Sequence, residues 1–391
     1  MNHLFRVLLL LWFPLSVMSQ HTMTIGERHT LQSSLLNEER TFWIYCPDNY
    51  HRTNYATTRY PVVYLLDGER NFLTQVTLQK VLASGLYRYM PEAIVVGIEN
   101  TVRSRDLTPS KSVVEYEGKK LHENSGGAKP FLEFLTGELR PHIDSIYRTN
   151  GYNLLVGHSF GGLFAMHTLV HHTQSFNAYV AIDPSLWWDN RKIYDEAAKL
   201  WPKINAQGVN LYIAMAGDDF KAEDKLRHSQ TIEEFCTRIL PQDPENGLRS
   251  HWKYYPDEDH GTIFLPATFD ALRFIFKGIT LPVKQVPNNV TLIDETYQKL
   301  SAQTGHQFVP EETLIEGIGR YALSINNVQG ALELFKYNLA NYPQSANAHI
   351  ALGDGLKAAG KKEEAAQMYR LAVTFDPSLG ETVAKKLSSA K

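Results

Sequence analysis

Short apolar runs alternate with longer amphipathic segments through the first two thirds of the chain. The runs are continuous enough to indicate strands buried on both faces of a parallel sheet, and they cover residues 61–66, 92–98, 153–158, 178–182 and 209–215, with a last strand at 251–255. The segments between them show helical periodicity, at residues 130–147, 163–172, 222–240 and 264–277. Residues 25–36 and 41–46 are rich in β-branched and aromatic side chains and predict an opening antiparallel hairpin. This alternation predicts an α/β domain with a mostly parallel sheet flanked by helices.

One strand, helix and tight turn between them carry a chemical motif. The run at 153–158 leads into Gly157-His158-Ser159-Phe160-Gly161, a GxSxG pattern, and a predicted helix follows directly. In a nucleophile elbow the two glycines let the backbone turn sharply, so that the serine Oγ is exposed. The alternative is a glycine turn with an inert serine. The flanking strand and helix favour Ser159 as a nucleophile.

The residues that would activate this serine should follow it in the order acid, then histidine, at the carboxyl ends of later strands. His260, in Asp-His-Gly after the last strand, has that position, and an imidazole with a pKa of about 6.5 can take and return the serine proton. Asp219 is the first choice for the acid and Asp218 is close behind it. Asp183 would serve if the preceding strand supplies the acid, and Glu223 is a weaker candidate. An unused aspartate would cap the helix that begins near residue 222.

Two backbone N–H groups are needed to hold the oxyanion that forms when serine attacks a carbonyl. The turn after strand 61–66 reads Asp67-Gly68-Glu69, and the N–H of Gly68 or Glu69 is our candidate for the first donor. The N–H of Phe160, which follows the nucleophile, is the second.

Two pairs of side chains are candidates for substrate binding. Arg103 and Arg105 stand in a predicted polar loop at 101–109, where they either meet an anionic or carbonyl-rich substrate or form structural pairs with aspartate. Trp187 and Trp188 follow strand 178–182 and could wall a pocket, although core packing is the expected role for one of them.

The last quarter of the chain repeats itself. Residues 279–292 contain two prolines and lose periodicity, which predicts a linker. Beyond it, four small, aromatic or proline positions recur 34 residues later, namely Gly319, Ala331, Phe335 and Pro343 as Gly353, Ala365, Tyr369 and Pro377. This is the tetratricopeptide period, and it predicts an all-α domain over 293–391 with repeats at about 312–345 and 346–379.

So short an array needs caps, which 293–302, the last helix from residue 381 or the catalytic domain would supply. The repeat pair offers a groove for a peptide or protein partner, or else a packing flange; its shortness favours the flange.

Composition changes this picture mainly at the N-terminus. One arginine precedes an apolar run at 7–18 that is too short to span a bilayer, which predicts a signal peptide over 1–19 and places the α/β domain at 20–278. The mature protein would then be periplasmic or secreted; an uncleaved anchor is the alternative. A net charge of −3 without a basic block argues against nucleic acid as a partner. Cys46 and Cys236 could form one disulfide or remain buried thiols.

No metal ion or organic cofactor is implied by the motifs. His167 and His171 are spaced i, i+4 without a glutamate between them, so a zinc site is not expected. Residues 355–362 nearly match a phosphate-binding loop, but Lys362 stands where serine or threonine must bind magnesium. Asn289 begins a glycosylation sequon, which matters only in a host that glycosylates exported proteins.

Over residues 24–278 the chain resembles the putative-esterase family of α/β-hydrolases, and it is most similar to periplasmic siderophore trilactone esterases of the salmochelin type. The resemblance rests on motifs at 65–69, 105–109, 131–148, 157–162, 184–188 and 259–261. It implies hydrolysis of a carboxylic ester or lactone, of a siderophore or another acyl ester, through an acyl-enzyme. Some members of that group work with a Ser-His dyad, which leaves the acid open, and the repeat pair departs from their pattern. Acyl transfer to a sugar or lipid alcohol, and a non-catalytic scaffold acting through the repeats, are the alternatives.

Overall fold

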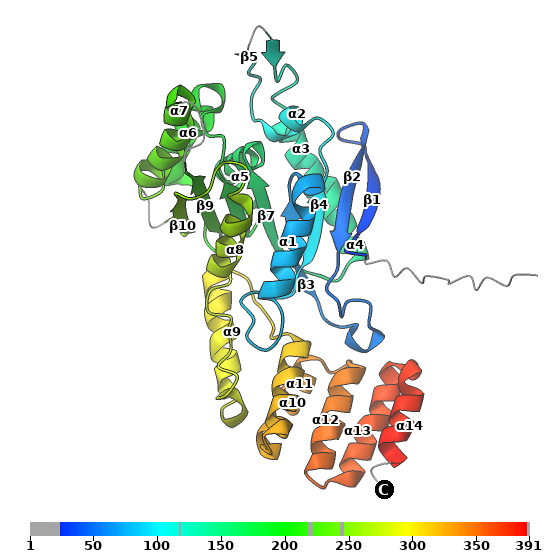
Figure 1. Cartoon of the computed structure of the whole chain (residues 1–391). Helices are drawn as coiled ribbons and strands as arrows, with labels where there is room; N and C mark the ends of the chain where they lie inside the picture. The colour runs from blue at the N-terminus through cyan, green and yellow to red at the C-terminus, as the bar shows by residue number, and fades with distance from the viewer. Residues whose placement is uncertain (1–23, 117–118, 218–221, 243–245, 389–391) are drawn as a thin grey trace, which may run out of the picture.

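The computed structural model describes residues 24–116, 119–217, 222–242 and 246–388, and it shows a layered α/β domain with a row of helices beneath it (Figure 1). The predicted signal peptide, Asp218 and Asp219 lie outside the described residues. Among the described helices, none has the length and apolarity to cross a membrane. Cys46 and Cys236 are free thiols rather than a disulfide.

The sheet has eight strands in the order β1-β2-β4-β3-β7-β8-β9-β10. β1 pairs with β2 and β2 with β4 in antiparallel fashion, and the remaining neighbours are parallel. The strands are β1 (Glu27–Ser33), β2 (Glu38–Tyr45), β3 (Tyr60–Leu65), β4 (Ile94–Ile98), β7 (Thr149–His158), β8 (Ala178–Ile182), β9 (Asn210–Ala216) and β10 (Arg249–Tyr255). The predicted mostly parallel sheet, with an antiparallel hairpin at its start, is confirmed.

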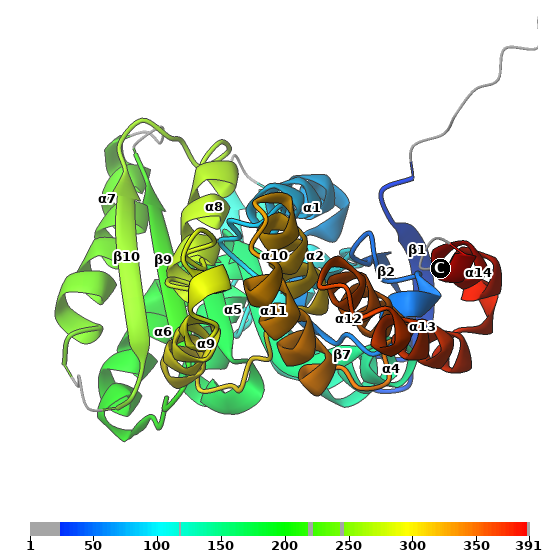
Figure 2. The same cartoon turned by 90° about the horizontal axis from the view of Figure 1, so that it is seen from below.

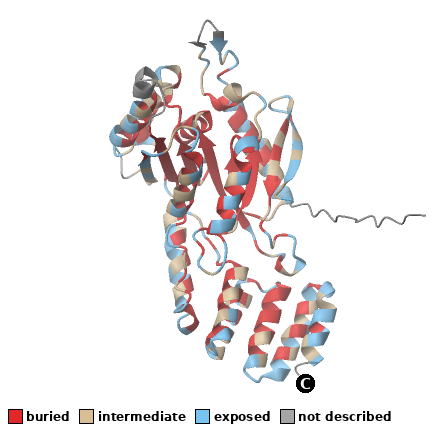
Figure 3. Ribbon diagram, in the orientation of Figure 1, coloured by how far each residue is buried: buried red, intermediate tan, exposed pale blue. Residues whose placement is uncertain are grey.

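Helices cover both faces of this sheet, so its central strands are buried throughout (Figure 3). One face packs against α1 (Gly68–Leu82) and α8 (Phe264–Ile275). The other face packs against α3 (Ala128–Phe134), α5 (Phe160–His171), α6 (Trp188–Leu200) and the end of α7 (Ala222–Glu234) with its continuation η5 (Phe235–Ile239). Because helices cover both faces of the sheet, its strands need apolar side chains on both sides, which explains the continuous apolar runs in the sequence.

Several local predictions need correction. The helix expected at 130–147 begins at Ala128, contains a π-helical turn, η2 (Leu135–Leu139), and ends as α4 (Arg140–Ile146). The polar loop expected at 101–109 contains a short helix, α2 (Arg103–Leu107). The small hairpin of β5 (Val114–Tyr116) and β6 (Lys119–Leu121), and helix α6, were not predicted.

The C-terminal quarter is helical, and its helices run beneath the sheet domain (Figure 2). They are α9 (Thr291–Thr304), α10 (Glu312–Ser324), α11 (Val328–Asn341), α12 (Ala346–Ala358), α13 (Lys362–Phe375) and α14 (Gly380–Ser388), with a turn, η7 (Pro377–Leu379), before the last. α10 and α12 begin where the two predicted repeats begin. The predicted linker contains η6 (Val286–Asn288) and buries Ile279, Leu281 and Val283.

The helical segment is joined to the sheet domain by a shared core and by polar contacts. One buried apolar cluster extends from α1 and α8 through α9 to Val383 of α14. In η1 (Thr53–Tyr55), the Tyr55 hydroxyl donates to Glu316 Oε2 at 2.6 Å and the Thr53 hydroxyl to Asp376 Oδ2 at 2.6 Å. These contacts lie before β3 begins, at the amino ends of the parallel strands. The helical segment therefore contacts the end of the sheet opposite the carboxyl ends, where ligands bind in such sheets.

Candidate active site

Ser159 occupies a sharp turn between β7 and α5. Its backbone has φ 59° and ψ −115°, a conformation that residues other than glycine rarely adopt. The N–H of Ser159 donates to Ile182 O at 2.9 Å. A Cβ on Gly157 would overlap the carbonyl of Gly161, so the turn closes only with glycine at 157. Strain of this kind is stored where the surroundings hold it, and here it presents the serine Oγ at the end of the strand.

His260 lies in the turn between β10 and α8 and meets this serine. Its Nε2 is 3.0 Å from Ser159 Oγ, within hydrogen-bond distance. The carboxylate of Asp259 accepts the N–H groups of Gly261 and Thr262 at 2.6 and 2.8 Å, which fixes the turn that carries the imidazole. The structure therefore brings together the predicted serine and histidine.

The carboxylate that reaches the histidine is that of Asp183, which directly follows β8. Asp183 Oδ2 is 2.5 Å from His260 Nδ1, and Oδ1 accepts the N–H of Ala216 at 3.0 Å. Asp183 was an alternative to Asp219 and Asp218, which lie outside the described residues; Glu223 belongs to the part of α7 whose side chains are not described. Serine, aspartate and histidine are thus connected in the chain order that the motif requires.

Asp183 is held in its ionised form although it is 1% exposed. Burial alone would raise the pKa of this carboxyl group, but hydrogen bonds from His228 and His260 hold the pKa well below its ordinary value. An ionised carboxylate can fix the tautomer of His260 and stabilise the imidazolium that forms when the ring accepts a proton.

Two further histidines surround His260, and sequence reasoning missed both. His158, in the motif itself, has its ring centroid 4.5 Å from that of His260, and burial together with the charge of His260 lowers its pKa to about 4. His228, on α7, places Nε2 at 2.9 Å from Asp183 Oδ2. His158 could have been found from the sequence, because it stands next to Ser159 in the motif. His228 could not, because no motif includes it.

The predicted oxyanion donors lie at the first turns of two helices. α1 begins at Gly68 and α5 at Phe160, and the first N–H groups of a helix have no acceptor within the helix. A Cβ on Gly68 would overlap the backbone of Gly97 in β4, so only glycine allows this close approach. Asp67, before it, takes the left-handed conformation with φ 54°.

Arg103 and Arg105 have separate partners. Arg103 makes a bidentate pair with Asp67, at 2.6 and 2.9 Å, and donates to His158 O at 3.3 Å, so it ties the first helix turn to the elbow. Arg105 donates to Asp106 at 2.7 Å and to Glu38 at 2.5 Å. Arg105 therefore belongs to a structural charge network, and Arg103 borders the site while being about one third exposed.

An aromatic wall stands beside the serine. Trp188 is 1% exposed and packs edge-on against Phe160 at 5.0 Å, while Trp187 lies 6.4 Å from Phe160 and is partly exposed. His122, from the segment after β6, packs edge-on against both Phe160 and Trp188, at 5.2 and 5.6 Å. Burial and the charge of Arg103 lower the pKa of His122, so the wall is uncharged there near neutral pH.

Among the described residues, Asp183, His228 and His260 have ligand atoms within 4.8 Å of one another, as a metal site would. Two of the contacts among them are hydrogen bonds to one carboxylate oxygen, so the three groups satisfy each other without an ion. Of the two histidines spaced i, i+4 on α5, His171 is paired with Glu196 at 2.9 Å. The ring of His167 packs against the ring of His171.

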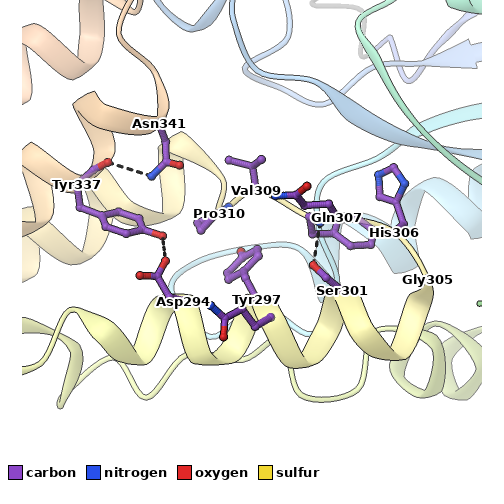
Figure 4. A pocket seen from close by; sticks show the side chains of 12 residues that line it. Asp294, Tyr297, Ser301, Gly305, His306, Gln307, Val309, Pro310, Tyr337 and Asn341 are labelled. Atoms are coloured by element: carbon purple, nitrogen blue, oxygen red, sulfur yellow. Dashed lines mark hydrogen bonds between the residues drawn. The ribbon is translucent and has the colours of Figure 1, made fainter.

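A pocket of about 580 Å³ lies elsewhere, between α9, α11 and the segment 305–310 (Figure 4). On its wall the Tyr337 hydroxyl donates to Asp294 Oδ1 at 2.7 Å. His306, also on the wall, lies near Gly151 at the start of β7, whereas Ser159 follows the end of that strand. This pocket is therefore at the opposite end of the sheet from the serine.

Comparison with known proteins shows which family this chain belongs to. A family profile described as Putative esterase matches residues 33–259. The siderophore enterobactin esterase of Emericella nidulans is 29% identical over 54% of this chain and 81% of its own length. The ferri-bacillibactin esterase BesA of Bacillus subtilis is 28% identical over 66% of this chain and 92% of its own length.

The crystal structure of an IroE-like serine hydrolase from Shewanella oneidensis is 32% identical, with a TM-score of 0.72, over 81% of this chain and 99% of that one. A share this large takes in part of the helical segment as well as the sheet domain. The fold, the match over more than half of the chain and the likeness over nearly the whole of a serine hydrolase show that this chain belongs to the putative esterase family and is an ester-hydrolysing enzyme.

Proposed function

We propose that this chain is an exported serine esterase that opens ester or lactone bonds of a siderophore through an acyl-enzyme on Ser159. The observation that carries the mechanism is the continuous hydrogen-bond chain from Ser159 Oγ through His260 to Asp183. The names of the relatives, which are esterases of siderophores, support the substrate class. The apolar run before Ser19 supports export.

In the acylation step, His260 Nε2 takes the proton of Ser159 Oγ as the oxygen attacks the ester carbonyl carbon. The carbonyl oxygen becomes an oxyanion, which the N–H of Phe160 and that of Gly68 or Glu69 would stabilise. When the carbonyl re-forms, His260 gives its proton to the departing alcohol. Asp183 stays ionised and supports the imidazolium throughout.

In the deacylation step the same groups act on water. His260 takes a proton from a water molecule that attacks the acyl-enzyme, and the proton returns to Ser159 as the free acid leaves. For a lactone, acid and alcohol remain in one molecule, so the first product is a ring-opened chain. Trp187, which is partly exposed and lies 6.4 Å from Phe160, supports a substrate with flat apolar groups, whereas Trp188 packs in the core.

The test is labelling of the protein with a fluorophosphonate probe, beside Ser159→Ala and His260→Ala. We expect labelling that maps to Ser159 by mass spectrometry, vanishes in Ser159→Ala and falls sharply in His260→Ala. Hydrolysis of enterobactin, the siderophore in the name of one relative, followed by chromatography, should require the same two residues. Absence of labelling in a folded protein would reject the mechanism; product esters formed with added alcohols would favour acyl transfer instead.

A further inference from the structure

One oxygen of Asp183 serves two histidines. His260 Nδ1 lies 2.5 Å and His228 Nε2 lies 2.9 Å from Asp183 Oδ2, while the other oxygen accepts the N–H of Ala216. An ionised carboxylate only accepts hydrogen bonds, so the ring nitrogen that faces it in each histidine carries the hydrogen. The carboxylate is therefore held by donors from three places in the chain: β9, α7 and the turn after β10.

His228 is built into this position. Its side chain is 7% exposed, and its ring stands nearly perpendicular to that of His260, with centroids 5.4 Å apart. The chain that follows His228 is anchored in the core, since Ile232 of α7 and Phe235 of η5 are fully buried. Arg191 of α6 also pairs with Glu234 at 2.6 Å. The helix thus holds the imidazole in place.

The position of Asp183 makes such support necessary. Its backbone has φ 44°, in the left-handed region, and the side chain is buried, so a lone carboxylate there would lose its hydration without compensation. A carboxylate with a single donor can also rotate about its Cβ–Cγ bond and present either oxygen. With three donors, one oxygen is fixed toward His260 Nδ1, which selects the tautomer whose Nε2 carries no hydrogen and can accept the serine proton.

We infer that His228 is a positioning residue of this esterase, which acts on catalysis through Asp183 by donating its Nε2–H to the carboxylate that orients His260. The inference rests on the proposed function of Ser159, His260 and Asp183. The effect of His228 on the serine passes through the carboxylate, which its Nε2 meets at 2.9 Å. Its loss should lower kcat and leave KM nearly unchanged, because the side chain is 7% exposed and acts on the carboxylate that orients His260.

The experiment compares His228→Gln, whose amide can still donate, with His228→Leu, which cannot, each in the wild-type and in the Asp183→Asn background. With p-nitrophenyl acetate as the probe, we expect His228→Leu to lower kcat about 10- to 100-fold, the loss of one hydrogen bond to a charged group. KM should change less than about twofold, and His228→Gln should recover most of the rate. In the Asp183→Asn background, His228→Leu should cause no further loss, because the two residues act through one interaction.

Three results would overturn the inference: unchanged kcat in His228→Leu, an equal loss in both backgrounds, or no recovery in His228→Gln. Thermal unfolding of every variant monitors folding, and His228→Met replaces His228→Leu if the latter does not fold. Ser159→Ala is run beside them. If Ser159→Ala keeps activity, the proposed function fails; if it is inactive while His228→Leu is fully active, only the role of His228 fails.

Discussion

At the scale of single residues, the source of the acid is the main difference between expectation and structure. Asp183 and Asp219 both follow a predicted parallel strand, so their positions in the sequence are equally suitable. What distinguishes Asp183 is the direction of His260 Nδ1, a three-dimensional property that one sequence does not display. The nucleophile and the histidine could be predicted because each has a local motif, and the acid has none.

Replacing Asp183 with asparagine should therefore remove most of the activity. An amide in place of the carboxylate stabilises the wrong tautomer of His260, so kcat should fall about 10³- to 10⁴-fold with little change in KM. Asp219→Asn is the matched control and should stay within about threefold of wild type. Steady-state hydrolysis of p-nitrophenyl acetate measures both, and the reverse ranking of the two variants would contradict the assignment.

Substitution of Arg103 should mainly affect the rate, and substitution of Arg105 should mainly affect stability. Arg103→Lys loses the bidentate pair with Asp67, which sets the first turn of α1, so we expect kcat to fall about tenfold with a small change in stability. Arg105→Lys weakens the network with Glu38 and Asp106, and we expect a loss of about 1 kcal/mol in the free energy of unfolding with kcat nearly unchanged. Activity and urea unfolding of both variants give the comparison. Equal rate losses would place Arg105 at the site as well.

At the scale of secondary structure, elements with a clear hydrophobic period were predictable and irregular ones were not. β8 was predicted with its observed bounds because every residue of it is buried. Helix α6 was not predicted, because its first turn contains three residues in the left-handed conformation, which hydrophobic periodicity does not reveal. These residues are Asp189, Asn190 and Arg191. The π-helical turn at Leu135–Leu139 inserts into an otherwise regular apolar stripe, so the sequence predicts one plain helix there.

The elbow glycines provide a test at this scale, because the two glycines that flank Ser159 in the motif differ in their surroundings. Gly157→Ala would place a methyl group against the carbonyl of Gly161, and we expect it to cost about 3 kcal/mol or more in the free energy of unfolding. A Cβ on Gly161 would meet Asp67 and Leu66 at 3.4 Å, so Gly161→Ala should stay within about 1 kcal/mol of wild type. Urea denaturation measures both; equal costs would show that the close approach at Gly157 is not the cause.

At the scale of the whole molecule, acidic groups are buried where the helices meet the sheet domain. Glu312 of α10 is fully buried and accepts a hydrogen bond from Ser345, and burial raises its pKa to about 7. Because this pKa lies above the ordinary value of 4.5, folding favours the protonated form. The contribution of Glu312 to stability is full below about pH 4.5 and is lost as the pH rises through 7.

Glu312→Gln should therefore reduce the loss of stability on going from pH 5.5 to pH 8. Between pH 5.5 and pH 8 this one group should account for about 2 kcal/mol of the loss in the free energy of unfolding. The exposed Glu363→Gln is the control and should follow the wild-type pH dependence. Melting temperatures of the three proteins across this range test the prediction, which fails if Glu312→Gln declines as steeply as wild type.

The apolar cluster shared by the sheet domain and the C-terminal helices couples the stability of the two parts, which the sequence does not show. Composition and the 34-residue period divide the chain near residue 278, and the tetratricopeptide assignment of the later segment stays a prediction. Yet Phe308 of the later segment packs against Tyr152 and Phe276 of the earlier one, with centroids 5.1 and 6.0 Å apart, inside one apolar cluster. The two parts should therefore melt as one cooperative unit with a single calorimetric endotherm. The C-terminal helices therefore cannot be removed without consequence. A chain cut at residue 278 would expose this cluster to water, and we expect it to aggregate even though its catalytic residues are intact.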